Sequence, residues 1–318
     1  MIKLSIIIPH YNSPLLLGRL LKSIPQSNKI QVLVIDDKSD EKYEVEYLEV
    51  KKNHNTNIKY LNNNTNKKGA GVCRNIGIQE ALGEWVLFAD SDDYFTSNFY
   101  ANIQKYLEAT DDVIFFPPTS IELDTGNISN RHIGYKTLLE KYLNNPNKKT
   151  ENFLRYKFSP PWSKLIKKRL IKQNDIYFDE VIASNDVMFS TKIGYCMEDF
   201  IVANEVIYCV TRNKGSLTMI ISDEVYDSRL YVFIKYYHYL KDKLPDNEFE
   251  NLRLSGRKYL IMSMNLGIKK VIKVFIELSK NNIRIVELKN FNPFWFLTRV
   301  RNVYNENKIN KKYYNKSK

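Results

Sequence analysis

The stretch Trp85-Val86-Leu87-Phe88-Ala89-Asp90-Ser91-Asp92-Asp93 joins four apolar residues to a group of three carboxylates. The apolar residues predict a short strand buried in a sheet, so the carboxylates fall in the turn at its carboxyl end. Carboxylates this close repel one another unless a cation lies between them or water solvates them fully. The turn is therefore either a site for a hard divalent cation that holds a phosphate-bearing ligand, or a solvated acidic turn.

Strand and helix signals alternate around this turn. Apolar runs predict further strands at residues 4–8, 32–35, 58–61 and 113–116. Helices are predicted at residues 15–23, 71–82 and about 97–107. Repeated strand–helix–strand units favour the α/β class, with a mainly parallel sheet that helices cover on both faces.

The second half of the chain shows a less regular pattern. Short helices are predicted at residues 168–171 and 186–195, and Phe178-Asp179-Glu180 is expected to end a short strand. Beyond Ser222 the chain is predicted to be mainly helical, with amphipathic stretches at residues 226–240 and 252–278.

Three polar clusters follow predicted strands. They are Tyr11-Asn12, Asp36-Asp37 and the acidic turn at residues 90–93. In a parallel sheet, ligands bind beyond the carboxyl ends of the strands. We therefore expect these clusters, although distant in sequence, to meet at one edge of the sheet and form a binding site.

The composition fits one large domain, or a domain with a smaller partner. Of the 318 residues, 43% are hydrophobic, and no apolar run approaches the roughly 20 residues that span a bilayer. Residues 4–8 are too few for a secretory signal, and three scattered cysteines fit a reducing cytosol rather than a disulfide framework or zinc site. The net charge of +12 favours an anionic substrate, membrane surface or nucleic acid, although excess lysine is often only solvated surface.

The order and spacing of several motifs resemble family 2 glycosyltransferases. The residues that carry this resemblance are Ser5-Ile6-Ile7-Ile8-Pro9-His10-Tyr11-Asn12, Val34-Ile35-Asp36-Asp37-Lys38-Ser39 and residues 69–93. A weaker match includes Trp162-Ser163-Lys164-Leu165, Phe178-Asp179-Glu180, Asn185-Asp186-Val187-Met188-Phe189 and residues 212–216. The resemblance implies the GT-A fold, a nucleotide-binding α/β sandwich with a mainly parallel mixed sheet.

The resemblance implies a nucleotide site at the first strands. Pro9 and Tyr11 would line the nucleobase pocket, where a tyrosine face stacks on uracil. Asp37 would accept hydrogen bonds from the base or ribose. Arg74 stands at the family's position for a cation near the nucleotide. Because Arg74 replaces the third glycine of a dinucleotide-binding motif, that motif is excluded. The alternatives are that Tyr11 caps the first helix and that Asp37 only forms a turn.

By the same resemblance, Asp92 is the metal ligand and Asp90 contacts ribose or a metal-bound water. Mn²⁺ or Mg²⁺ is expected there, because a departing nucleoside diphosphate accumulates negative charge that a divalent cation stabilises. A calcium-binding EF-hand is excluded, since it needs glycine at its sixth position, where Phe95 stands.

Asp186 is the expected catalytic base, which would deprotonate the acceptor hydroxyl in an inverting transfer. The family usually has Glu-Asp here, whereas this chain has Asn185-Asp186. Asp186 could alternatively cap the following helix. The competing carboxylates are Asp179, Glu180, Glu198 and Asp199.

Three further residues are assigned less directly. Trp162 is either a wall of the acceptor site or a core tryptophan, and Arg212 and Ser216 are candidates for contacts with the diphosphate. The four histidines show neither metal-ligand spacing nor a triad partner.

Two domains are expected. Residues 1–220 form the GT-A domain, with a nucleotide half at about 1–120 and an acceptor half at about 121–220, and residues 221–318 form a helical C-terminal extension. The aromatic residues at 291–296 and the lysine-rich tail suit a peripheral contact with an anionic membrane, or form a helical cap with a disordered tail.

The sequence thus predicts an inverting, metal-dependent glycosyltransferase. Its donor is expected to be a UDP-sugar, and its acceptor a glycan or lipid-linked hydroxyl in capsule, lipopolysaccharide or related synthesis. The expected location is the cytoplasm, at the inner face of the plasma membrane. The alternatives are a sugar-phosphate nucleotidyltransferase, which would need a basic, glycine-rich loop after the first strand, and a nucleic-acid-binding protein, against which the acidic edge argues.

Overall fold

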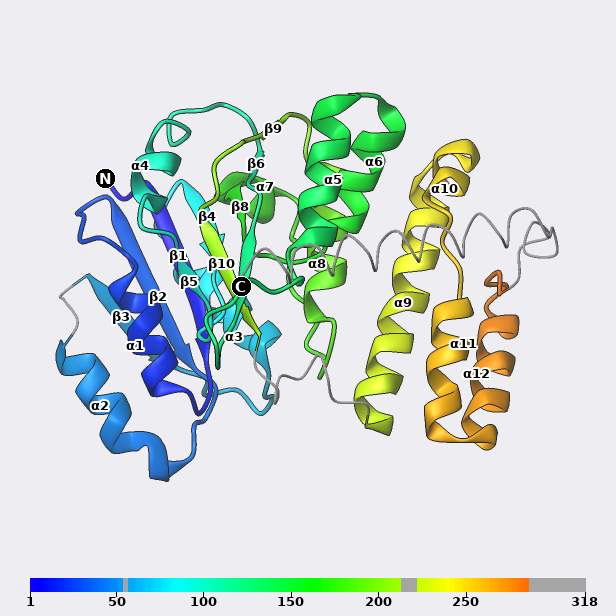
Figure 1. Cartoon of the computed structure of the whole chain (residues 1–318), viewed down its shortest axis with the longest axis horizontal. Helices are drawn as coiled ribbons and strands as arrows, with labels where there is room; N and C mark the ends of the chain where they lie inside the picture. Colours follow the sequence, from blue (N-terminus) through cyan, green and yellow to red (C-terminus); the bar gives the residue numbers. More distant parts are fainter. Residues whose placement is uncertain (54–56, 213–221, 286–318) are drawn as a thin grey trace.

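The computed structural model describes residues 1–53, 57–212 and 222–285. A seven-stranded sheet has the order β3-β2-β1-β4-β8-β6-β9. A second sheet of three strands has the order β5-β10-β7. Figure 1 shows the sheets in one part of the molecule and the last helices in the other.

The parallel half of the large sheet contains β1 (Leu4–His10), β2 (Ile30–Asp36), β3 (Ile58–Asn62) and β4 (Trp85–Phe88). β1 lies in the middle, parallel to β2 on one side and β4 on the other. Every residue of β1, β2 and β4 is buried, as continuous apolar runs require in a sheet covered on both faces. These strands and the α/β class are confirmed.

The other half of the sheet is mixed. β8 (Lys164–Lys167) runs antiparallel to β4 and to β6 (Val113–Phe115), while β9 (Phe200–Val202) is parallel to β6. The second sheet joins β5 (Tyr94–Phe95), β7 (Thr119–Glu122) and β10 (Tyr208–Arg212). Since β5 directly follows the acidic turn, this small sheet ties that turn to a strand more than a hundred residues later.

Helices pack around the large sheet. They are α1 (Pro14–Lys22), α2 (Glu44–Asn53), α3 (Ala70–Glu80), α4 (Phe99–Gln104), α5 (Ile133–Asn144), α6 (Lys148–Lys157), α7 (Lys168–Gln173) and α8 (Asn185–Cys196). The predicted helices near residues 15, 71, 168 and 186 are confirmed. The helix expected at about 97–107 is shorter, and α2, α5 and α6 had no prediction.

The strand expected to end at residues 178–180 is wrong. This segment is a loop whose backbone pairs with a side chain instead of a strand. The Asn75 side-chain amide donates to the Phe178 carbonyl at 3.0 Å and accepts from the Phe178 amide at 2.8 Å. One side chain thus supplies the hydrogen bonds that a neighbouring strand would have given.

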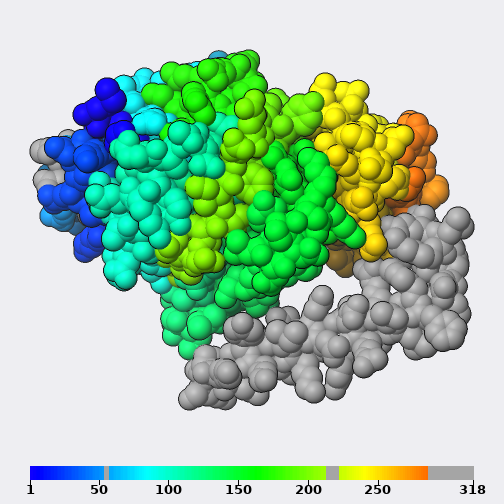
Figure 2. Space-filling model, turned by 90° about the horizontal axis from the view of Figure 1, so that it is seen from above, coloured from blue at the N-terminus to red at the C-terminus, as the bar shows by residue number. Residues whose placement is uncertain are grey.

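The C-terminal part is helical, as predicted. It contains α9 (Asp223–Lys243), α10 (Asp246–Leu252), α11 (Arg257–Ser263) and α12 (Ile268–Lys280). Its core is a cluster separate from that of the sheet, and it packs on α6 and α8. In Figures 1 and 2 these helices form the yellow and orange end of the molecule.

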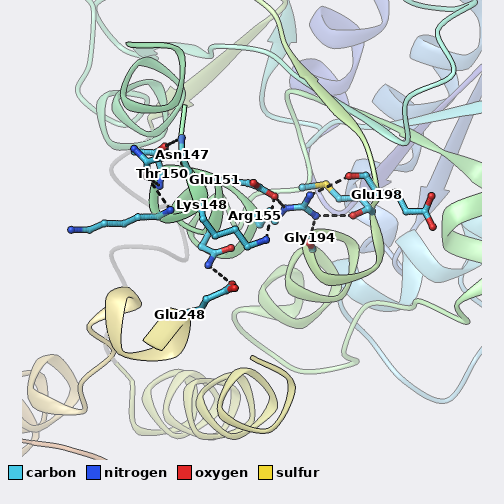
Figure 3. A network of polar contacts seen from close by, with 11 residues as sticks. Asn147, Lys148, Thr150, Glu151, Arg155, Gly194, Glu198 and Glu248 are labelled. Carbon is cyan, nitrogen blue, oxygen red and sulfur yellow. Dashed lines mark hydrogen bonds and ion pairs between the residues drawn. The ribbon is translucent and has the colours of Figure 1, made fainter. Parts of the chain in front are cut away.

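Polar contacts connect α6 with its neighbours (Figure 3). Arg155 donates to the carbonyls of Gly194 at 2.9 Å, Met197 at 2.7 Å and Glu198 at 3.2 Å, at the C-terminal end of α8. On the same helix, buried Asn152 donates to Glu248 of α10 at 2.7 Å. Helix α6 therefore contacts both α8 and the C-terminal helices through polar side chains.

Candidate active site

The three polar clusters meet at one edge of the large sheet. They follow β1, β2 and β4, which are adjacent and parallel, so about 10 Å separates the turns after β2 and β4. Direct contacts join them. The Asp37 amide donates to the His10 carbonyl at 2.8 Å, and the hydroxyls of Ser13 and Ser91 lie 3.0 Å apart. The predicted convergence of the turns is confirmed.

Asp37 is buried and held from both sides. Its Oδ1 accepts from Asn63 at 2.7 Å and its Oδ2 accepts from the Gly69 amide at 2.7 Å. Gly69 has a φ of +132°, a conformation that L side chains rarely adopt, so glycine is needed to aim this amide. The carboxylate therefore keeps a fixed orientation at the strand end.

Pro9 is buried within β1, whereas Tyr11 is 44% exposed beyond its end. The Lys68 ammonium lies 3.8 Å from the centre of the Tyr11 ring. Ser13, not Tyr11, is the N-cap of α1. The Lys68 cation thus covers one face of the ring, and a nucleobase would stack on the other face.

His10 has a carboxylate partner that the sequence did not predict. Its Nδ1 lies 2.8 Å from Asp36 Oδ1, and its Nε2 accepts from the Ser13 amide. Although burial opposes ionisation, hydrogen bonds from His10 and Ser39 lower the pKa of Asp36 to about 2. This buried pair fixes the turns after β1 and β2 from within.

Asp93 anchors the acidic turn and does not face a ligand. It is 2% exposed, and its carboxylate accepts from the Tyr208 hydroxyl at 2.8 Å and the Thr211 amide at 2.7 Å. Tyr208 also accepts from the Asp90 amide at 2.9 Å. Two residues of β10 therefore set the conformation of a turn that follows β4.

Asp92 is held through its backbone carbonyl. Its carbonyl accepts from Arg19 at 2.5 Å and from the Thr211 hydroxyl. Burial, and then the charge of Asp90, raise the pKa of the Asp92 carboxyl. A divalent cation would relieve both effects, because it compensates the buried negative charge.

The residues of this turn fit a cation of the Mg²⁺ type. Such ions take one or two carboxylates and complete their coordination with substrate phosphates and water. Asp90 and Asp92 supply that number. Within the described residues, no group of three or more His, Cys, Asp and Glu side chains forms a complete protein site. A cation here would therefore depend on the phosphates of a ligand.

Arg74 of α3 connects the acidic turn to the start of α8. It donates to Asp90 Oδ1 at 2.5 Å and to Asn185 Oδ1 at 2.7 Å. The guanidinium is 5% exposed, and it lies over the Phe178 ring. Three of the predicted site residues are thus in direct contact.

Asp186 lies in the first turn of α8, whose N-cap is Ser184. Burial raises the pKa of its carboxyl, while Arg74 and Lys164 oppose this shift. The loop before it packs tightly on α3, because a methyl group at Gly71 would meet the Asp179 carbonyl at 2.4 Å. A raised pKa and a fixed position are what a general base needs.

The competing carboxylates are engaged or distant. Asp179 pairs with Lys235 at 2.7 Å, and Glu180 pairs with Lys67 at 2.6 Å. Glu198 and Asp199 follow the C-terminal end of α8, about 18 Å from Asp186 at the helical rise. Asp186 is the candidate base that the geometry favours.

The remaining predicted residues lie around this centre. Trp162 is 6% exposed and stacks on Tyr208 at 5.6 Å, so its ring is part of the core that supports the acidic turn. Arg212 pairs with Glu122 at 3.4 Å at the end of β10. Ser216 lies outside the described residues.

Sequence reasoning missed the residues that support the turns. Those residues are Arg19, Asn63, Tyr208 and Thr211. Each contacts a partner that is distant in the sequence and is brought near only by the tertiary fold. None of them lies in a recognisable local motif. The one local signal was the apolar run that ends in Thr211-Arg212, which could have suggested a strand near the site.

A mainly parallel sheet with an acidic turn and converging polar clusters at its carboxyl edge defines an α/β protein of the GT-A type. The family model described as "Glycosyl transferase family 2" matches residues 5–186, more than half of the chain. The chain therefore belongs to glycosyl transferase family 2, a family of glycosyltransferase enzymes, and the predicted family and fold are confirmed.

Two curated relatives show how far the likeness extends. The poly(ribitol-phosphate) beta-N-acetylglucosaminyltransferase TarS of Staphylococcus aureus is 29% identical over 222 residues, which cover 68% of this chain and 36% of TarS. The GalNAc(5)-diNAcBac-PP-undecaprenol beta-1,3-glucosyltransferase of Campylobacter jejuni is 31% identical over 189 residues, 58% of this chain and 57% of the relative. The matched part thus spans little more than a third of TarS.

Solved structures share the fold. The structure of S. aureus TarS 1-349 in complex with UDP-GlcNAc has a TM-score of 0.67 at 20% identity, and covers 99% of this chain and 93% of its own. The mannosyltransferase PcManGT from Pyrobaculum calidifontis, in complex with GDP-Man and Mn²⁺, has a TM-score of 0.55 at 14% identity, with 93% and 83% covered.

Proposed function

We propose that this protein is an inverting glycosyltransferase that moves a sugar from a nucleoside diphosphate, with UDP as the preferred nucleotide, to an acceptor hydroxyl. The observation that carries the proposal is the Arg74 bridge, which joins Asp90 in the acidic turn to Asn185 beside Asp186. The bridge brings the expected diphosphate site and the expected base together. A one-step displacement needs the two sites close together, because the acceptor hydroxyl activated by the base must attack the sugar as the donor diphosphate leaves.

Each residue has a role in this proposal. Tyr11 and Pro9 bind the base and Asp37 the base or ribose. Asp92, with Asp90 beside it, would hold Mn²⁺ or Mg²⁺, which when bound supplies positive charge for the departing diphosphate. Asp186 takes the proton of the acceptor hydroxyl, and its raised pKa suits that task.

Asn185 stands where the family usually has a carboxylate. An amide oxygen accepts from Arg74 without adding negative charge. Asp186 is therefore the only carboxylate of this residue pair. In the same proposal Arg212 and Ser216 are candidate contacts of the diphosphate, whereas the buried Trp162 supports the acidic turn from the core.

The destination we propose is a cell-surface polysaccharide. TarS is named for poly(ribitol-phosphate), and the Campylobacter relative for an undecaprenol-linked glycan. The acceptor would then be a glycan or a lipid-linked glycan, reached in the cytoplasm at the inner face of the plasma membrane. No helix within the described residues is long and apolar enough to cross a bilayer.

The experiment is a panel of UDP-, GDP- and TDP-sugars with Mn²⁺, read by release of the free nucleotide. Wild type is expected to hydrolyse one UDP-sugar slowly without acceptor, and calorimetry to detect Mn²⁺-assisted UDP binding. Asp92→Asn should lose that binding, whereas Asp186→Asn should bind UDP but lose transfer by roughly 10²-fold or more. Full transfer by Asp186→Asn would move the base elsewhere, and cation-independent activity would reject the metal.

A further inference from the structure

Helix α12, the last helix of the C-terminal part that the structure describes, presents an apolar stripe to solvent. Its members are Ile268, Ile272, Phe275 and Ile276, which are 71%, 55%, 52% and 46% exposed. At roughly 100° per residue they share one face, centred about 125° from the buried Val274 and Leu278. The stripe is thus a second apolar face, separate from the one that packs on the protein.

Two further apolar side chains are exposed in the preceding turn and helix. Met264 in the turn is 67% exposed, and Ile261 on α11 is 53% exposed. We call these six residues the α11–α12 surface. Exposed apolar side chains scattered singly need no explanation, but a contiguous set indicates a binding surface.

Cations border this surface along one side. Lys269, Lys273 and Lys280 fall about 100–140° around α12 from Ile268, directly beside the stripe. Among the described residues, none of these three lysines has a carboxylate within 4.0 Å. On α11, Arg257 and Lys258 are exposed near Ile261. The nearest acid on α12, Glu277, lies beyond the lysine row and accepts from Asn281 at 3.2 Å.

We propose that the α11–α12 surface docks this protein on an anionic lipid bilayer. An apolar stripe edged by lysines matches a bilayer interface, in which apolar side chains enter the acyl boundary and ammonium groups reach the phosphates. In a dimer formed through this surface, the lysine row of one copy would face the lysine row of the other copy or an uncharged part of it. The charge pattern therefore favours lipid over self-association.

Ion pairs fix the start of α12 on α9. Lys270 at the start of α12 pairs with Asp223 at 2.9 Å and Asp227 at 2.7 Å, in the first two turns of α9. The turn between α11 and α12 lies at the lower edge of Figure 1, the edge toward which β1 and β2 run. The α11–α12 turn and the carboxyl ends of β1 and β2 thus lie toward the same edge of the molecule in this view.

The test is flotation of the full chain with vesicles of phosphatidylglycerol and phosphatidylcholine, and with phosphatidylcholine alone. Wild type should float with the anionic vesicles only. Ile272→Ser/Phe275→Ser and Lys269→Gln/Lys273→Gln should each weaken binding, the lysine pair by roughly 30-fold. These side chains are exposed, so both variants should keep the wild-type melting temperature.

Matched controls keep the result specific. Leu82→Ser removes an exposed leucine elsewhere, and Lys141→Gln/Lys149→Gln removes two exposed lysines of α5 and α6, and both should float like wild type. The proposal is overturned if wild type ignores anionic vesicles, or if Ile272→Ser/Phe275→Ser floats unchanged. It is also overturned if light scattering shows that this variant only dissociates an oligomer. None of these residues belongs to the transfer site, so nucleotide release tests the proposed function separately.

Discussion

The Tyr208 hydroxyl donates to Asp93 Oδ2 at 2.8 Å and joins β10 to the acidic turn across more than a hundred residues of sequence. The same hydroxyl accepts from the Asp90 amide at 2.9 Å. One fully buried side chain therefore satisfies both ends of the turn that carries Asp92. The shape of the candidate site depends on a residue that itself contacts no ligand.

Tyr208→Phe should destabilise the protein by about 1–3 kcal/mol, because it removes the hydrogen bond of the buried Asp93 Oδ2 and that of the Asp90 backbone amide. Chemical denaturation measures the loss in the free energy of unfolding. Tyr11→Phe, at an exposed position, is the control and should change stability by less than about 0.5 kcal/mol. Equal stability of Tyr208→Phe and wild type would show that the hydroxyl is dispensable.

Asp36 should make the fold sensitive to acid. Its pKa is about 2 in the folded chain against an ordinary value of 3.8. A lowered folded-state pKa contributes stability that is present above the ordinary value and is lost as the pH falls toward 2. Asp36→Asn should therefore lose about 2 kcal/mol at pH 7 and show a flatter stability profile between pH 4 and 2. A profile as steep as that of wild type would contradict this assignment.

Asp186 should set the acidic limb of the activity profile. Because burial raises the pKa of its carboxyl, kcat/KM should fall at a pH above the ordinary Asp range. Lys164 is buried nearby, and burial lowers its pKa to about 7, so it is charged across that limb. Lys164→Met removes this charge and should move the limb toward neutral pH.

A pH profile of kcat/KM for nucleotide release, measured at donor concentrations below saturation, checks both statements. Lys164 donates to the Phe158 carbonyl at 2.6 Å, so the variant also loses stability. Only the position of the limb, and not the height of the profile, tests the coupling to Asp186. An unmoved limb in a folded Lys164→Met would separate the two groups.

Arg74→Lys should keep the charge and lose the bridge. An ammonium cannot reach Asp90 and Asn185 with the fork geometry of a guanidinium. Loss of one charge-assisted hydrogen bond corresponds to about 1.5–3 kcal/mol, so kcat/KM should fall roughly 10- to 100-fold. Arg169→Lys, at a half-exposed pair with Asp112, is the matched control and should retain activity. Retained activity in Arg74→Lys would make the bridge structural only.

The sequence predicted what local patterns encode. Buried strands read as continuous apolar runs, and polar residues at their ends predicted where the clusters meet, as the contact between Asp37 and His10 confirms. The partners of these residues could not be predicted. Arg19, Tyr208 and Thr211 act across sequence distances that no motif spans. The segment at Phe178 was predicted as a strand but is a loop, and its backbone hydrogen bonds go to the Asn75 side chain instead of a neighbouring strand. The membrane prediction for residues 291–296 and the C-terminal tail lies outside the described residues.

Guanidinium groups hold α8 at both of its ends. Arg74 engages Asn185 at the first turn, and Arg155 of α6 collects the carbonyls of Gly194, Met197 and Glu198 at the last (Figure 3). A methyl group at Gly194 would meet the Arg155 carbonyl at 2.2 Å, so the two helices lie in direct backbone contact. Helix α8 is thus held at both ends by other helices. A displacement of α8 would therefore move α6 with it and, through the contact of Asn152 with Glu248, would reach the C-terminal helices.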